Sequence, residues 1–423
     1  MDRKKAVKIC NNFLNYYFKS STSKPELDYN CKPFINLVQA VWEDVCSSDY
    51  SDSDLTYSTI EHHILRLKSK PLDDSSFYSS LISSVKTSFE INKGEHFVII
   101  PLHGSRLNQK ISFGNKMFYL IPAEENEQTL FHCLSDVMNI NYDKCVNMFE
   151  HTKNSRSQDF FKHNLLLIRL ENQTSNVKSS AITIAIHTIY LIHMLYWTLN
   201  ETEDILFFIK NRSIDCLKEN HHVVIMSKDE WRCGHGNTWN GVPKCQIDLK
   251  FLEDKKYQKI FLHLFTEFII EPGDELTHRF VNSLVLLNRG FQFEKKNDSA
   301  LATLLYTTSA EALLAAGQNE KRLRFAAILS KLICIEGKNR TEIANILESV
   351  YKKRNNFVHA GQSPFYEYRD DDKDDLALTR IAISKLILKY NEITTLLSTQ
   401  NEGDRSKKWD LYIDQLFRKL LFG

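Results

Sequence analysis

Apolar residues recur at intervals of three and four through the first 90 residues, which is the spacing of one face of an α-helix. Residues 34–45 and 59–67 follow this pattern most clearly. Stretches rich in Ser and Asp at 47–54 and 71–76 separate the periodic segments and predict loops. We therefore expect residues 1–90 to form a mainly helical region.

The pattern changes after Gly94, where short runs of β-branched and aromatic residues alternate with turn residues. A Gly114-Asn115 pair separates two of these runs and predicts the turn of a β-hairpin. The strand candidates are residues 97–100, 111–113, 117–121, 165–170 and 223–226. Because a helical pattern lies between the later runs, residues 91–270 are expected to form a mixed α/β region.

Residues 181–199 (AITIAIHTIYLIHMLYWTL) form an apolar segment that is almost long enough to span a bilayer. His187 and His193 interrupt the segment, and it lacks strongly basic flanks. Membrane-spanning helices are normally flanked by Lys or Arg on their cytoplasmic side. We therefore expect a buried helix here and no membrane span.

The turn-forming sequence Glu271-Pro272-Gly273 separates this mixed region from five successive helical patterns. We expect these patterns to pack as a bundle over residues 271–400, followed by an amphipathic helix within residues 401–423. Asp298 is suited to cap the second helix of the bundle. The predicted fold class is therefore α+β, with a mixed α/β N-terminal region followed by an all-α bundle.

The fourth helical pattern of the bundle carries an arginine on its apolar face. Four residues after Val350 on that face, the sequence places Arg354. An arginine there must be paired, because an unpaired buried charge is very costly. In residues 299–317, which are apolar almost all round, Glu311 is the only charged residue. These two lone charges predict a Glu311–Arg354 ion pair between two helices.

Two further polar residues lie near the end of the same helix. Asn355 and His359 are four residues apart and so share the face next to Arg354. Gly361 and Pro364 then predict the end of the helix. The same spacing also fits an ordinary helix with a surface arginine and a surface histidine, so the spacing alone leaves both interpretations open.

Residues 354–359 (RNNFVH) read as the Arg-polar-x-x-x-His motif of HEPN domains, and this region resembles the Apea-like branch of the HEPN superfamily. The helix that contains Glu311 is similar to the acidic helix that precedes the motif in that family. The resemblance covers roughly residues 272–397. It implies a small helical bundle in which Arg354, Asn355 and His359 are catalytic and Glu311 supports them.

The activity implied by this resemblance is cleavage of RNA by attack of its own 2′-hydroxyl, without a metal ion or another cofactor. Histidine suits the proton transfers because it titrates near neutrality, and arginine binds phosphate oxygens with a planar fork. Family members usually form dimers whose two motifs face one cleft. A homodimer is therefore implied, with two copies of His359 supplying acid and base.

The resemblance also implies a biological setting. Apea-like proteins resemble bacterial anti-phage effectors that stop host growth by damaging RNA, with tRNA as one candidate substrate. Residues 1–270 would then sense a phage-derived or host trigger, or restrain the site. The alternative is a non-catalytic HEPN module for binding or dimerisation in a defence or toxin–antitoxin system.

The charge distribution bears on the expected RNA partner. The net charge of +1 excludes a global basic field for nucleic acid. Residues 317–354 are locally basic, with nine Lys and Arg against four Glu. This excess favours phosphate contacts near the motif, although most such clusters are solvated faces. The candidate RNA contacts are Arg322, Arg324, Lys352 and Lys353.

Nine scattered cysteines, without a secretory apolar segment, favour a reducing cytoplasm. The Gly-rich residues 231–245 (WRCGHGNTWNGVPKC) predict a loop that contacts a trigger or RNA. Histidines and cysteines in and beside this segment could bind zinc, although their spacing fits no standard ligand pattern. These residues are Cys233, His235, Cys245 and either His221 or His222.

Overall fold

The computed structural model describes most of the chain as helices and one main sheet. The described residues are 3–19, 28, 30–45, 53–65, 67, 71, 73–124, 126–154, 159–171, 177–199, 217, 222–227, 231–235, 247–270, 273–314, 320–333, 340–360, 371–397 and 405–422. An antiparallel sheet precedes a helical C-terminal region, so the predicted α+β class is confirmed.

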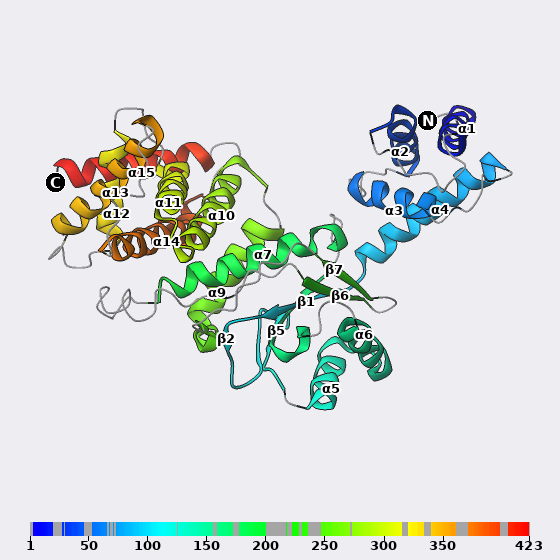
Figure 1. Cartoon of the computed structure of the whole chain (residues 1–423), viewed down its shortest axis with the longest axis horizontal. Coiled ribbons are helices and arrows are strands. Elements are labelled where there is room, and N and C mark those ends of the chain that lie inside the picture. The colour runs from blue at the N-terminus through cyan, green and yellow to red at the C-terminus, as the bar shows by residue number, and fades with distance from the viewer. Residues whose placement is uncertain are drawn as a thin grey trace.

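Four N-terminal helices pack around an apolar core of their own. They are α1 (Arg3–Lys19), α2 (Lys32–Val45), α3 (Ser53–Leu65) and α4 (Asp74–Lys93). Figure 1 shows this unit set apart from the rest of the chain and joined to it through α4, which leads into the sheet. The helical character expected of residues 1–90 is confirmed, although α3 and α4 begin inside stretches that were expected to be loops.

A six-stranded sheet follows, with the strand order β3-β4-β5-β1-β6-β7 and antiparallel pairing between all neighbours. A separate parallel pair joins β2 (Ser105–Arg106) to β8 (Ile247–Asp248). The main strands are β1 (His96–Leu102), β3 (Ile111–Phe113), β4 (Phe118–Ile121), β5 (Asn164–Leu170), β6 (His222–Ser227) and β7 (Trp231–His235). All strands expected from the sequence are present. The backbone φ angle is positive at Gly114 and Asn115, as a tight hairpin between β3 and β4 requires.

The expectation of a loop over residues 231–245 is wrong for its first five residues. These residues form β7 and pair with β6, and the register sets His222 opposite His235. Glycine weakens the local strand signal, but hydrogen bonds to a neighbouring strand outweigh local preference. The remaining residues of the segment lie outside the described part of the chain.

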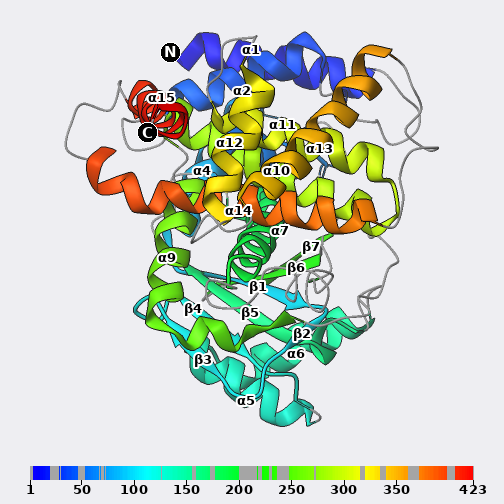
Figure 2. The same ribbon diagram turned by 90° about the vertical axis from the view of Figure 1, so that its left-hand side faces the viewer.

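Both faces of the sheet are covered, because alternate strand residues enter two different cores. Phe97 and Ile99 belong to one core with α5 (Glu127–Met138) and α6 (Tyr142–Asn154). Val98, Ile100 and the alternate residues of β5 belong to a second core that includes α7. Figure 2 shows α7 between the sheet and the C-terminal helices. The sheet therefore supports the bundle through α7.

α7 (Val177–Tyr196) is the helix expected over residues 181–199, and most of its residues are buried. None of the helices in the described part of the chain is long and apolar enough to cross a membrane. His193 of α7 accepts a hydrogen bond from the backbone N–H of Leu217 at 2.8 Å, so its other ring nitrogen carries the proton and donates to Asn288 Oδ1 at 2.9 Å. This histidine is structural and ties α7 to the bundle.

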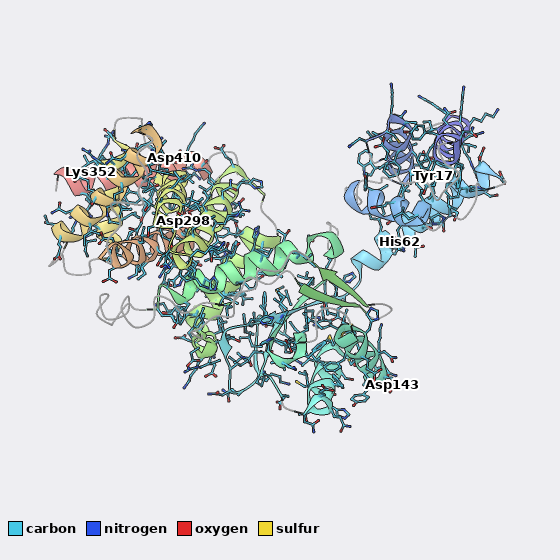
Figure 3. The ribbon with its side chains drawn as sticks, viewed as in Figure 1. Tyr17, His62, Asp143, Asp298, Lys352 and Asp410 are labelled. Carbon is cyan, nitrogen blue, oxygen red and sulfur yellow. The ribbon has the colours of Figure 1, made fainter. Side chains whose placement is uncertain are left out.

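The C-terminal helices share one continuous apolar core with α7 and with one face of the sheet. The predicted boundary at residues 271–273 therefore falls in a stretch whose two sides pack into the same core. Asp298, which is labelled in Figure 3, caps α11 as expected. Its side chain accepts a hydrogen bond from the backbone N–H of Leu301 at 3.1 Å. The helices are α9 (Lys255–Phe265), continued by a π-helical turn (Thr266–Ile270), α10 (Glu275–Lys295), α11 (Ser299–Leu314), α12 (Lys321–Ile333), α13 (Arg340–Ala360), α14 (Asp371–Leu397) and α15 (Arg405–Phe422).

A buried ion pair joins α10 to α14 inside this core. The Arg380 side chain is 0% exposed, and its Nη1 lies 2.5 Å from Oε2 of Glu294, which is 11% exposed. Tyr306 donates its hydroxyl proton to the same carboxylate. The guanidinium also faces the rings of Trp197 and Phe291, at 4.9 and 4.4 Å from their centroids. This cluster links three helices of the bundle, and the turn that follows α7, through one charged centre.

Candidate active site

The motif residues lie near the C-terminal end of α13, where the apolar face of the helix gives way to polar residues. Leu347 and Val350 of this helix are buried in the bundle core. Four residues after Val350, the side chain of Arg354 is 18% exposed and lies at the margin of that core. The expectation that Arg354 follows the apolar face of its helix is therefore confirmed.

Glu311 of α11 is the acidic partner of Arg354. The Nη2 atom of Arg354 lies 3.4 Å from Oε2 of Glu311, whose side chain is 17% exposed. The predicted ion pair is present, but its distance exceeds the roughly 2.7–2.9 Å that is common for charge-assisted hydrogen bonds. The Nε–H group of Arg354 is buried and has no hydrogen-bond partner among the described residues. Glu311 therefore satisfies only some of the hydrogen-bond donors of the Arg354 guanidinium.

Tyr351 is a third member of this cluster. It donates its hydroxyl proton to Oε1 of Glu311 at 2.5 Å, and its ring centroid lies 5.7 Å from Cζ of Arg354. Burial raises the pKa of Tyr351, and the hydrogen bond to Glu311 adds to this effect, so the hydroxyl remains a donor at neutral pH. The sequence reasoning missed Tyr351, because it resembles one more apolar residue of the stripe. Its position three residues before Arg354 is the signal that places both on one face.

Asn355 and His359 extend the cluster toward solvent. Nη1 of Arg354 donates to Oδ1 of Asn355 at 3.0 Å, and Asn355 is half-buried. His359 is exposed in the last turn of α13. Within the described part of the chain, the His359 side chain makes no hydrogen bond or ion pair. The structure therefore brings Arg354 and Asn355 together and leaves His359 open at the helix end.

Two of the four candidate RNA contacts, Arg322 and Lys352, are exposed. Arg322 and Lys352 both approach Oε1 of Glu348, at 3.4 and 3.3 Å. Lys352 lies on the side of the bundle away from the sheet (Figure 3), and Lys353 is half-buried. Glu348 therefore offsets part of the positive charge of both Arg322 and Lys352.

Arg324, the fourth candidate, is only 8% exposed. Its guanidinium bonds to the carboxylates of Glu320 and Asp414 and lies 4.8 Å from the ring centroid of Phe417. These contacts attach α15 to α12. A role of Arg324 in RNA binding stays a prediction that its burial does not favour.

The zinc candidates are not placed as a complete set. His221 and Cys245 lie outside the described residues, while the strand register of β6 and β7 places His222 opposite His235. Among the described residues, these two included, no group of three His, Cys, Asp or Glu gathers closely enough to hold a metal ion. The structure thus gives no geometry for a metal centre beside Arg354.

Comparison of the chain with protein-family models, with curated proteins and with solved structures found no match.

Proposed function

We propose that the chain is a HEPN-type endoribonuclease whose active site contains Arg354, Asn355 and His359. The observation that supports this best is a pair of contacts near the end of α13. Arg354 forms an ion pair with Glu311 and donates a hydrogen bond to Asn355. One turn beyond Asn355, His359 is open to solvent. A permanent cation and a titratable ring thereby stand at one helix end, and cleavage of a phosphodiester needs both.

In the proposed reaction, a base removes the proton of the RNA 2′-hydroxyl, and the 2′ oxygen attacks the adjacent phosphorus. The bond between phosphorus and the 5′ oxygen then breaks, and an acid protonates that oxygen. Arg354 offsets the additional negative charge on the phosphate, and His359 carries out one of the proton transfers. The products are a 2′,3′-cyclic phosphate and a 5′-hydroxyl. Because RNA and side chains supply every group, we propose that this reaction proceeds without a metal ion.

The two proton transfers need two groups, and each chain offers one motif histidine. We propose that two copies associate through residues 272–423, with both His359 side chains beside a shared cleft. The neighbouring Val358 is 46% exposed, which suits a surface that a second copy covers. An excess of His359→Ala chain should then suppress wild-type activity through mixed dimers. Activity that follows the wild-type fraction linearly, from a protein that sediments as a monomer, would refute a composite site.

Cleavage itself is tested with purified protein and labelled structured RNA, including tRNA, in the presence of EDTA. Wild-type protein should cut the RNA, and His359→Ala should lose about 10²-fold or more of the rate, which is the usual contribution of general acid–base catalysis. His278→Ala is the matched control, because His278 is an exposed histidine on α10. If both variants retain wild-type rates, or if cleavage stops in EDTA and returns with magnesium, the proposed chemistry is wrong.

A second candidate function is a non-catalytic module for binding or dimerisation. The observation that favours it is that no described residue orients the ring of His359. Overexpression in bacteria separates the two candidates. A nuclease predicts toxicity that His359→Ala relieves while the protein stays folded, whereas a binding module predicts the same growth for both. A role in anti-phage defence, with the α1–α4 unit responding to a trigger, extends the nuclease proposal; the separate core of that unit suits such a part.

A further inference from the structure

One face of α1 is buried in the N-terminal unit, and the opposite face is exposed. The buried face carries the residues that α1 contributes to the core of that unit, namely Ala6, Cys10, Phe13, Leu14 and Tyr17. The exposed face carries Lys5, Lys8, Asn12 and Tyr16. These four residues follow one another at intervals of three and four, so they form one stripe along the helix. Figures 1 and 2 both show α1 on the side of its unit that faces away from the sheet.

α1 differs from the rest of its unit in charge. It contains five Lys and Arg and no Asp or Glu, whereas the other described residues of the α1–α4 unit contain eight Asp and Glu against three Lys. Within the described part of the chain, neither Lys5 nor Lys8 forms an ion pair or a hydrogen bond, and Arg3 donates to the neutral hydroxyl of Ser79 at 3.2 Å. The charges of these three residues are therefore not paired with a described carboxylate. A basic surface of this kind attracts phosphate groups.

An aromatic ring extends the same stripe. The Tyr16 side chain is 43% exposed, although most large apolar and aromatic residues of this unit are buried. Its hydroxyl group hydrogen-bonds to Cys31, just before α2, and this contact fixes the outer end of the side chain. Lysines beside an exposed aromatic ring are the combination with which proteins bind single-stranded nucleic acid, because phosphates contact the cations and a base stacks on the ring.

Other partners of a basic helix fit this face less well. A helix that binds an anionic membrane inserts its apolar face between the lipids. In α1 that face is buried against α2 and α4, so only the polar face is presented. A nucleic-acid duplex offers phosphates, but its bases are stacked on one another and not on the protein. The ring of Tyr16 therefore favours a single strand, whose bases are free to stack.

We propose that the exposed face of α1 binds single-stranded nucleic acid. Lys5 and Lys8, together with Arg3, contact phosphates, and the ring of Tyr16 stacks on a base. Asn12, which lies between them, offers amide donors to the strand. From Lys5 to Tyr16 the helix rises about 17 Å, which is enough for several nucleotides. The proposal does not rest on the nuclease activity, because none of the motif residues lies on α1.

The test is fluorescence anisotropy with the full-length His359→Ala protein in EDTA, so that RNA stays intact. The probes are oligouridine and oligodeoxythymidine of about ten nucleotides, a length within the range of single-stranded sites, and a duplex of equal length. We expect saturable binding of a single strand that is at least about fivefold tighter than binding of the duplex, since one stacked base provides this factor. Binding of both single strands, or of the RNA alone, would support the proposal and identify the source of the strand.

Three results of this titration would overturn the proposal: no saturable binding of either single strand, a duplex that binds as tightly, or binding to phosphatidylserine vesicles without binding to either strand. The assay measures binding only. A protein that fails to cleave RNA therefore still gives a clear answer here, and a protein that cleaves RNA without binding through α1 does so as well.

Variants locate the binding. Lys5→Gln/Lys8→Gln should weaken it at least about fivefold and reduce the slope of log K against log salt by about 1.4, because each phosphate contact on a single strand contributes about 0.7. The matched control is Lys255→Gln/Lys259→Gln, which removes two exposed charges of α9. Equal weakening by the two double variants would show non-specific attraction, and no weakening by Lys5→Gln/Lys8→Gln would place the strand elsewhere. Either result would overturn the site.

Tyr16 provides a separate readout. Tyr16→Ala should weaken binding at least about fivefold, whereas Tyr16→Phe should stay near wild type, because stacking needs the ring and not the hydroxyl. Thermal unfolding of each variant confirms a folded protein. If Tyr16→Phe binds as weakly as Tyr16→Ala, the hydrogen bond to Cys31 and not the ring would be responsible, and the assignment of a stacked base would be overturned.

Discussion

Replacement of Glu294 by glutamine is a direct test of how the bundle is held together. The change removes the negative charge from a carboxylate that lies 2.5 Å from Arg380, whose side chain is 0% exposed. The glutamine keeps the size of the side chain and an oxygen that can accept from Tyr306. The variant therefore isolates the loss of charge pairing, because neither a cavity nor a missing hydrogen bond to Tyr306 adds to it.

The expected loss in the free energy of unfolding depends on how deeply the ion pair is buried. Removing one partner of a buried pair typically costs about 3–5 kcal/mol, because the other charge remains without water or a counter-ion. We expect the lower end, about 3 kcal/mol, since the glutamine oxygen can still accept from Arg380. Glu311→Gln is the matched comparison: its pair spans 3.4 Å and both side chains are 17–18% exposed. Water can reach Arg354, so that change should cost only about 1 kcal/mol.

The measurement is urea unfolding followed by tryptophan fluorescence, because Trp197 and Trp409 are fully buried in the same core as Arg380. Glu294→Gln should lower the midpoint without changing the slope of the transition. Arg380→Met should also destabilise, and the double variant should lose clearly less than the sum of the two, because an apolar replacement of a buried pair is often nearly neutral. Equal midpoints for Glu294→Gln and Glu311→Gln, or additive losses in the double variant, would refute this reasoning.

Three further predictions concern single polar groups. Burial lowers the pKa of His193 from 6.5 to about 4, so the contribution of the neutral ring to stability is complete above pH 6.5 and is lost as pH falls toward 4. Between pH 7 and pH 5, the urea midpoint should therefore fall by the equivalent of about 2 kcal/mol. His193→Gln should remove most of this pH dependence. Asp298→Ala should cost about 1 kcal/mol in the same assay by removing the cap of α11, whereas Asp298→Asn should stay near wild type. Tyr351→Phe should cost about 1 kcal/mol by removing the hydrogen bond to Glu311, and in the RNA assay it should lower the rate less than His359→Ala does. A Tyr351→Phe protein as inactive as His359→Ala would place Tyr351 in the chemistry.

The sequence predicts those features of the fold that are marked by a local change from apolar to polar or turn-forming residues. The strands of the sheet stand out because β-branched runs are bounded by turn residues, and α7 stands out because it is apolar on every face. The Glu311–Arg354 contact was predictable for the same reason: each is a lone charge in an apolar setting. A single charge in such a segment must find a partner, and the sequence offers few.

Features that depend on tertiary contact were not predictable in this way. Glu294 lies in a polar sequence just before two lysines, so nothing local marks it as the buried partner of Arg380. Residues 231–235 carry a weak strand signal and become β7 through pairing with β6. Arg324 belongs to a basic cluster in the sequence, yet the helix α15 covers it. In each case a partner more than 85 residues away, or a neighbouring strand, decides the outcome.

Arg354 and His359 differ in their structural contacts, and this difference determines which of their variants can be used to test the proposed chemistry. Arg354 forms an ion pair with Glu311 and a hydrogen bond to Asn355. Its replacement would therefore disturb the contact between α11 and α13 and any contact with the substrate at the same time. His359 is exposed and bonds to no described residue, so its removal should leave the free energy of unfolding nearly unchanged. A loss of RNA cleavage in His359→Ala at unchanged stability can then come only from chemistry, substrate binding or pairing of two copies. The mixing experiment separates pairing from the other two, because only a shared site lets an inactive chain suppress an active one.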